Sequence, residues 1–193
     1  MHVEIKKRRA LMKEKSFLKK PGPVGMRTVK TAATAALLAS VYYLIDRNPA
    51  FACIGVIFGM GVDMKDSIQN GGNRLFGTLI GGVLAVILFR VYLFAFPEGG
   101  HSMYLAVLLF IGIIVLIQLC RTFWPGGVQP GGVILCIVLF STPVHSYLSY
   151  AVNRIFDTAV GVIVALLVNW VLQKDRQKGF IEEIRHFLEH MND

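Results

Sequence analysis

Long apolar runs recur along the chain from Val29 to about residue 172, and short clusters of turn-forming residues separate them. Several of these runs approach the ~20 residues that a helix needs to cross the hydrocarbon core of a bilayer. A soluble domain of 193 residues, of which 54% are hydrophobic, has room for one core but no use for repeated runs of this length. The pattern therefore predicts an all-α integral membrane protein.

The turn clusters divide the apolar sequence into six predicted membrane spans. They are rich in Gly, Pro, Asn and Asp, which favour turns over helix interiors. A basic tail is predicted before the spans, over residues 1–27, and an amphipathic helix after them, over residues 173–193. The predicted spans are residues 28–45, 50–63, 73–96, 103–120, 131–143 and 154–172.

Lys and Arg are distributed unevenly between the connections. Ten of the 20 basic residues lie in the first 30 positions. With the N-terminus inside, cytoplasmic segments would hold seventeen basic residues and outer connections two, with Arg90 inside a span. The positive-inside rule therefore predicts that both termini are cytoplasmic. Basic charge ahead of a membrane span indicates a lipid bilayer as partner and not nucleic acid.

Residues 73–88 and 153–168 align without gaps at an offset of 80. They share Asn, Arg, Phe, Thr, Gly and Ala at identical places, and most other positions exchange one aliphatic residue for another. Each repeat, about 28–96 and 103–172, would contain three spans, so the second copy would enter the membrane upside down. Inverted repeats are common in secondary transporters. The alternative is a chance similarity between two apolar helices.

Arg74 and Arg154 occupy the second position of this repeat, at the start of the last predicted span of each half. A helix N-terminus is partly positive, and a guanidinium there suits a carboxylate, which it can grip with two parallel hydrogen bonds. Asn73 and Asn153 are expected to cap the two helices. The four residues are candidates for substrate binding or gating. Alternatively, each arginine reaches lipid phosphate or caps a neighbouring helix.

The middle span of each repeat is short, and the second is bracketed by Pro130 and Pro143. Short, Gly/Pro-bounded segments in corresponding positions point to a substrate site in transporters, although a tilted helix in a locally thinned bilayer would look the same. Asp63, Asp66 and Asp157 are candidates for ion coupling. The simpler expectations are a helix cap at Asp66 or Ser67, a solvated loop pair of Asp63 with Lys65, and an intrahelical pair between Asp157 and Arg154.

Several functional classes find no support in the sequence. The three cysteines are scattered through apolar runs and form no disulfide framework or metal motif. We find no nucleophile motif, no His-Glu-x-x-His and no phosphate loop, so we expect neither an enzyme nor a cofactor or metal.

The segments GMRTVKTAATAALL and NPAFACIGVIFGMGVDMKDSIQNGGNRLFGTLIGGVLAVIL resemble the fusaric acid resistance and aromatic acid exporter superfamily, in its short six-helix bacterial branch. The features that carry the resemblance are the opening of the first helix, the small-residue second helix, and the Asn-Arg pair with its following glycines. The resemblance implies a multipass plasma-membrane protein that exports organic anions, most familiarly aromatic carboxylates. Similar plant malate channels imply a homodimer in which both subunits build one conduit.

Two functional hypotheses follow. In the first, a homodimer transports organic anions, with Arg74 and Arg154 attracting the substrate at the two mouths. In the second, a non-transporting membrane module recruits partners or organises lipid through its basic N-terminal tail and its amphipathic C-terminal helix.

Overall fold

The computed structural model describes residues 25–99 and 103–172, and within these ranges all regular structure is helical. This confirms the all-α prediction. The helices α4, α5 and α7 are long and apolar enough to cross a membrane. Residues 1–24 of the predicted basic tail, which is expected to run to residue 27, and the predicted C-terminal helix, residues 173–193, lie outside the described residues. The elements are α2 (Met26–Leu44), α3 (Ala50–Gly59), α4 (Met64–Ala95), α5 (Met103–Phe123), the 3-10 helix η1 (Pro125–Gly127), α6 (Val128–Ser141) and α7 (Tyr147–Val171).

Two helices begin earlier than the apolar runs predicted. α4 begins at Met64 rather than residue 73, because Asp63 caps it: the Asp63 carboxylate accepts a hydrogen bond from the Asp66 backbone N–H at 2.8 Å. α7 begins at Tyr147 rather than residue 154. Hydropathy marks where a helix becomes apolar, whereas backbone hydrogen bonding starts up to two or three turns earlier, in polar sequence.

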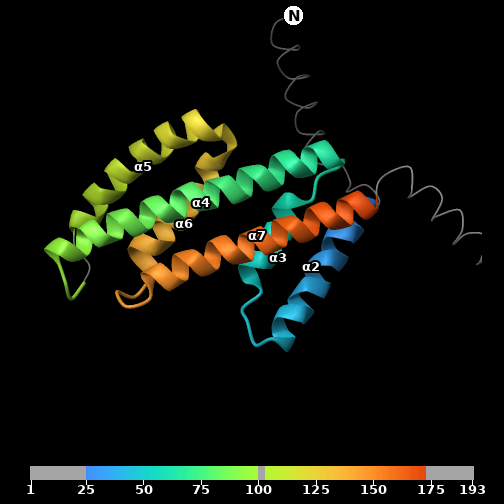
Figure 1. Cartoon of the computed structure of the whole chain (residues 1–193), viewed down its shortest axis with the longest axis horizontal. Coiled ribbons are helices and arrows are strands. Elements are labelled where there is room, and N and C mark those ends of the chain that lie inside the picture. Colours follow the sequence, from blue (N-terminus) through green and yellow to red (C-terminus); the bar gives the residue numbers. More distant parts are fainter. Residues whose placement is uncertain (1–24, 100–102, 173–193) are drawn as a thin grey trace, which may run out of the picture.

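The two longest helices, α4 and α7, run side by side in opposite directions through the centre of the molecule (Figure 1). The short helix α3 packs across α7, and the short helix α6 packs across α4. α5 flanks α4 and α6, while α2 flanks α3 and α7. The two short helices therefore lie against the central pair, and each is flanked by one further helix.

Glycines bring the crossing helices into backbone contact. A Cβ atom added at Gly55 of α3 would lie 2.9 Å from the Thr158 carbonyl oxygen of α7 and 3.0 Å from Gly161 Cα. A Cβ added at Gly131 of α6 would lie 2.9 Å from the Gly77 carbonyl oxygen of α4. Because such distances leave no room for a side chain, small residues are required at both crossings.

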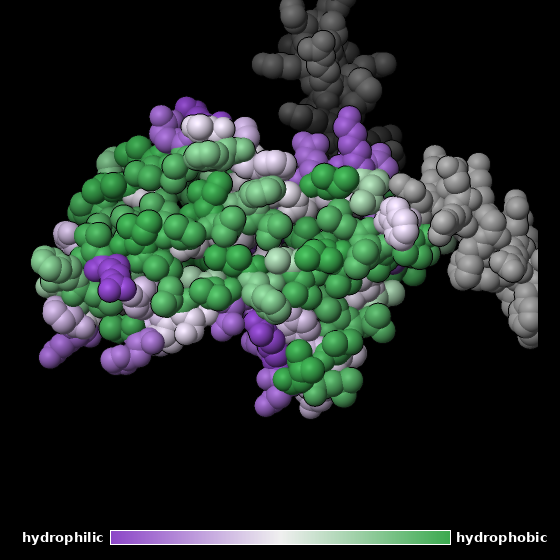
Figure 2. Space-filling model, in the orientation of Figure 1, coloured by the Kyte–Doolittle hydropathy of each residue, from purple (hydrophilic) through white to green (hydrophobic). Residues whose placement is uncertain are grey.

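Two apolar clusters hold the helices together, one built on α4, α5 and α6 with the N-terminal part of α7, and the other on α2, α3 and the C-terminal part of α7. Many large apolar side chains remain exposed, with Phe94 93% accessible. Figure 2 shows a face on which hydrophobic residues cover most of the helical surface, while hydrophilic residues gather mainly at its edges. A surface of this kind is expected of a multipass membrane protein, because hydrocarbon surrounds it in place of water.

A polar network joins α2, α7 and the α3–α4 connection. Lys30 is 7% exposed, and its ammonium group donates to the Asn169 side-chain oxygen. The Asn169 amide donates to the Asp63 carbonyl oxygen at 2.8 Å and to Ser67 Oγ at 2.7 Å. Ser67 Oγ also accepts from the Gly61 backbone N–H at 2.7 Å. These bonds fix one end of the helix bundle.

Candidate functional site

Arg74 lies inside α4, ten residues after the first residue of the helix, so the prediction that it stands at a helix N-terminus is wrong. Its guanidinium carbon lies 5.5 Å from the centre of the Phe58 ring of α3. Its Nε atom is buried without a hydrogen-bond partner among the described residues. The charge is therefore held against an aromatic face, an arrangement that stabilises a cation only modestly.

Arg154 lies seven residues after the first residue of α7, and its predicted place at a helix N-terminus is also wrong. Its guanidinium carbon lies 3.5 Å from the centre of the Phe51 ring and 4.2 Å from that of Tyr150. Its Nε atom is likewise buried and unpaired within residues 25–99 and 103–172. Both arginines thus combine aromatic contacts with unused donor capacity.

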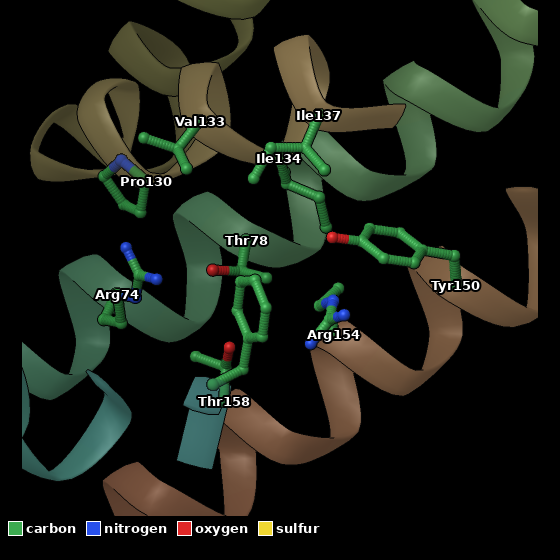
Figure 3. Close-up of a pocket in the computed structure, with 10 residues that line it drawn as sticks. Arg74, Thr78, Pro130, Val133, Ile134, Ile137, Tyr150, Arg154 and Thr158 are labelled. Atoms are coloured by element: carbon green, nitrogen blue, oxygen red, sulfur yellow. The ribbon is translucent and has the colours of Figure 1, made fainter. Parts of the chain in front are cut away.

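The two arginines line one narrow space between α3, α4, α6 and α7, which we call the constriction (Figure 3). Its volume is about 10 Å³, roughly enough for one water molecule. Thr78 and Thr158, which are equivalent in the 80-residue offset, both line it, and the Thr158 hydroxyl is buried without a described partner. The lining residues are Phe51, Arg74, Thr78, Pro130, Val133, Ile134, Ile137, Tyr150, Arg154 and Thr158.

A larger cavity adjoins each arginine. The Arg74 cavity has a volume of about 420 Å³, and the Arg154 cavity has a volume of about 310 Å³. Both are within the range of small-molecule sites, about 300–1,000 Å³. The Arg74 cavity is lined by Phe58, Asn70, Asn73, Arg74, Gly126, Gln129, Pro130 and Val133. The Arg154 cavity is lined by Asp46, Arg47, Asn48, Tyr150, Asn153, Arg154 and Asp157.

Asn73 and Asn153 are not helix caps, which corrects the prediction. The Asn73 side-chain oxygen accepts a hydrogen bond from Trp124 Nε1 at 2.7 Å, so it fastens the α5–α6 connection to α4. The Asn153 side-chain oxygen accepts from Arg47 Nη2 at 3.2 Å, so it fastens the α2–α3 connection to α7. Each asparagine therefore holds the connection that precedes a short crossing helix.

The three acidic candidates separate into two groups. Asp63 caps α4 and Asp66 lies in its first turn, and neither is among the residues that line the constriction or the two cavities. Asp157 lines the Arg154 cavity, and its carboxylate pairs with Arg47 Nε at 2.9 Å rather than with Arg154. The expectations of a cap at Asp66 or Ser67 and of an Asp157–Arg154 pair are both wrong, because Asp63 caps α4 and Arg47 pairs with Asp157.

Sequence reasoning missed the aromatic residues that hold the arginines. Phe51 and Phe58 are seven residues apart on α3, so they lie on the same face of that helix. This spacing could have been used for prediction, because two phenylalanines on one face of a short span can each contact one of the two arginines. No feature of the sequence predicts the contact between Arg47 and Asp157.

The chemistry available at this site is anion binding. Two guanidinium groups line one constriction, and within residues 25–99 and 103–172 neither has a carboxylate in an ion pair. Nor do these ranges hold a group of three His, Cys, Asp or Glu residues that could bind a metal ion. A planar guanidinium offers parallel donors to a carboxylate, and this match makes arginine the preferred residue for that group.

Residues 23–172 match the profile of a family described as Aromatic acid exporter family member 1. The chain belongs to this family. Membership supports a membrane protein of an exporter family, and it confirms the resemblance drawn from the first two helices and the Asn73-Arg74 pair with its following glycines. Among the described helices, α4, α5 and α7 agree with the multipass membrane protein that an exporter requires.

Curated relatives of this exporter-family chain are UPF0421 proteins of staphylococci. The protein of Staphylococcus haemolyticus is 27% identical over 163 residues, which cover 83% of this chain and 46% of the relative. That of Staphylococcus saprophyticus is 26% identical over 152 residues, covering 77% of this chain and 43% of the relative. The chain thus spans less than half the length of these relatives, whose names state no substrate. No solved structure matches the chain.

Proposed function

We propose that the protein exports organic anions, and in particular aromatic carboxylates, along a path through the Arg74 cavity, the constriction and the Arg154 cavity. The observation that carries this proposal is that two arginines without a described anionic partner line one space between two solute-sized cavities. Their aromatic neighbours suit a substrate that joins a carboxylate to a ring, since rings stack on Phe, Tyr and guanidinium faces.

The constriction must widen during transport, because about 10 Å³ holds a water molecule and no aromatic acid. Its apolar wall comes from one side of α6, through Pro130, Val133, Ile134 and Ile137. α6 rests on α4 through glycine contacts, which present little side-chain bulk to resist sliding. We therefore assign the gate to movement of α6, and of α3 in the other half, against the central pair.

The six helices are proposed to span the membrane as two inverted repeats with both termini in the cytoplasm of a plasma-membrane protein. The crossings support this, because Gly161 of α7 and Gly81 of α4, equivalent at the offset of 80, contact α3 and α6 respectively. Asn73 and Asn153 support it too, since each holds the connection of the opposite half.

The exposed residues Lys65 and His145 would then lie on opposite sides of the bilayer, so a membrane-impermeant maleimide should label Lys65→Cys and His145→Cys from opposite sides. Labelling of both from one side would contradict the topology.

A homodimer is part of the proposal. Val133 is 48% exposed although it lines the constriction and the Arg74 cavity, so this wall of the path is open to the surroundings in a single copy. A second copy seated here would separate the path from lipid. Cys136 is exposed on the same helix, so the test uses a variant in which the three native cysteines are replaced by alanine. In that background, cross-linking of Val133→Cys to itself in membranes should give a dimer, whereas Val91→Cys, on the exposed face of α4, serves as the comparison.

The function is tested by release of labelled phthalate from lipid vesicles that contain the purified protein. Phthalate is an aromatic carboxylate that stays ionised at neutral pH and therefore leaks little through lipid. The wild type should release it faster than empty vesicles, and the Arg74→Gln/Arg154→Gln variant should not. Arg90→Gln is the matched control, because Arg90 is exposed on the same helix as Arg74 and lines neither cavity nor constriction. Wild-type release at the level of empty vesicles, or equal release by the double variant, would refute the proposal.

A further inference from the structure

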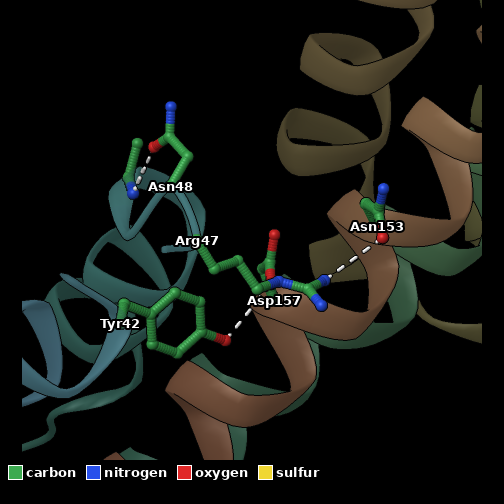
Figure 4. A network of polar contacts seen from close by, with 6 residues as sticks. Tyr42, Arg47, Asn48, Asn153 and Asp157 are labelled. Carbon is green, nitrogen blue, oxygen red and sulfur yellow. Dashed lines mark hydrogen bonds and ion pairs between the residues drawn. The ribbon is translucent and has the colours of Figure 1, made fainter. Parts of the chain in front are cut away.

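The Arg154 cavity contains a second guanidinium, which an internal carboxylate holds (Figure 4). Arg47, from the α2–α3 connection, places its Nε atom 2.9 Å from Asp157 Oδ1 of α7. The Tyr42 hydroxyl donates to the same Asp157 oxygen at 3.2 Å. The Asp157 side chain is 5% exposed, whereas that of Arg47 is 35% exposed. The carboxylate is thus fixed inside the helix bundle, while its arginine partner stands at the cavity on a connecting segment.

The two cavities differ in charge. The Arg74 cavity is lined by one arginine, by amides and by apolar groups, with no carboxylate. The Arg154 cavity is lined by two arginines and by the carboxylates of Asp46 and Asp157. The position equivalent to Asp157 at the offset of 80 is Gly77, so the difference arises where the two repeats diverge in sequence.

We propose that Arg47 is an anion-binding residue of the Arg154 cavity and that Asp157 is its built-in competitor. A carboxylate that enters this cavity is gripped by Arg154 and Arg47 together, and to reach Arg47 it must displace Asp157. This inference rests on the proposed function. It adds Arg47 to the residues that bind the anion, and it adds competition by Asp157 as the means by which that binding is regulated.

Geometry supports the exchange. Asp157 lies three residues after Arg154 on α7, so their side chains neighbour each other on one face of the helix. An anion at Arg154 therefore sits close to the Asp157 carboxylate, which repels it and competes for Arg47. Arg47 also donates to Asn153 and lies 4.9 Å from the centre of the Phe156 ring, so it remains positioned beside α7 if its bond to Asp157 breaks.

The consequence is an asymmetric path. The Arg74 cavity retains an anion through an arginine that no lining carboxylate opposes, whereas the Arg154 cavity lets the anion go when Asp157 reclaims Arg47. Under the proposed topology, the Arg74 cavity faces the cytoplasm and the Arg154 cavity faces outward. Weak retention at the outer cavity speeds release to the outside, which is what an exporter requires.

The test measures phthalate binding to purified full-length protein by calorimetry. An Arg74→Gln background is used so that the Arg154 cavity dominates the signal. Asp157→Asn keeps the shape of the side chain and a hydrogen-bond acceptor but removes the competing charge. We expect it to tighten phthalate binding about tenfold, which corresponds to about 1.4 kcal/mol. Adding Arg47→Gln should abolish this gain, whereas adding Arg90→Gln should preserve it.

Three outcomes would overturn the inference. Unchanged or weaker binding by an Asp157→Asn variant that elutes as the folded protein does would show that Asp157 does not compete with the ligand. A gain that survives Arg47→Gln would show that Arg47 does not hold the anion. If either of these two binding results is obtained while phthalate release from vesicles depends on Arg74 and Arg154, the inference is wrong and the proposed function stands. If neither release nor binding occurs in any variant, the proposed function fails with it.

Discussion

Neighbouring glycines on α6 offer a matched test of the helix crossing that forms the constriction. A Cβ atom at Gly131 would lie 2.9 Å from the Gly77 carbonyl oxygen, and ordinary contact begins at 3.4 Å, so α6 must move away from α4 by about 0.5 Å, the difference between the two distances. A Cβ atom at Gly132 would meet only Leu116 Cδ2, at 4.0 Å. Either alanine gains up to about 1 kcal/mol of helix propensity over glycine, so this term cancels between the two variants.

The remaining difference is the cost of overpacking, about 1–3 kcal/mol. For a chain of this size, 1 kcal/mol corresponds to about 2–4 °C in melting temperature. Gly131→Ala should therefore melt roughly 2–12 °C below Gly132→Ala when both are heated in the same detergent, at the same rate, with tryptophan fluorescence as the signal. Gly132→Ala should match or exceed the wild type. Equal melting of the two variants, with equal phthalate release, would refute the crossing and with it the described constriction.

Two further changes test the polar contacts between helices. Asn169→Ala leaves the buried Lys30 ammonium without its acceptor and the Asp63 carbonyl oxygen without its donor, so the free energy of unfolding should fall by about 1–3 kcal/mol in the same melting assay. Asn169→Asp restores only the acceptor for Lys30, so it should recover part of this loss. Asn73→Ala removes the acceptor of Trp124 Nε1, so in a Trp170→Phe background the emission of Trp124 should shift in wavelength and stability should drop by about 1 kcal/mol. An unchanged emission would mean that the indole has another partner.

The apolar runs predicted much of this architecture because burial in hydrocarbon leaves a direct trace in sequence. Each of the six predicted spans overlaps a helix, and of these helices α4, α5 and α7 are long and apolar enough to cross a membrane. The predicted starts of α4 and α7 come nine and seven residues after the observed ones. The errors share one cause. The segments before Asn73 and Asn153 are polar enough to resemble connections, yet Asp63 caps the first of them and both continue as helix. A helix boundary depends on backbone hydrogen bonds, which hydropathy does not register.

The site was predicted in its residues but not in its geometry. The offset of 80 singled out Arg74 and Arg154, which both line the constriction. Their environment could not be deduced, because it depends on partners distant in sequence. Trp124 is 51 positions from Asn73, and Arg47 is 110 positions from Asp157. In sequence Arg47 counts only as an outer-loop charge, and only the folding of α2 and α3 against α7 brings it to a carboxylate.

The two arginines also predict how the protein responds to a ligand. The guanidinium groups of Arg74 and Arg154 are half-buried, and among the described residues their charges are compensated by aromatic contacts, worth about 0.5–2 kcal/mol each, and not by an ion pair. An anion that pairs with them should therefore stabilise the fold. At a phthalate concentration of 100 times its dissociation constant the gain is about 2.7 kcal/mol, or roughly 5–11 °C in melting temperature. Cyclohexane-1,2-dicarboxylate keeps both carboxylates but lacks the aromatic ring, so it should raise the melting temperature less than phthalate because ring stacking is lost. The Arg74→Gln/Arg154→Gln variant should show no rise in melting temperature with phthalate. A rise equal to that of the wild type would mean that the anion binds elsewhere on the protein.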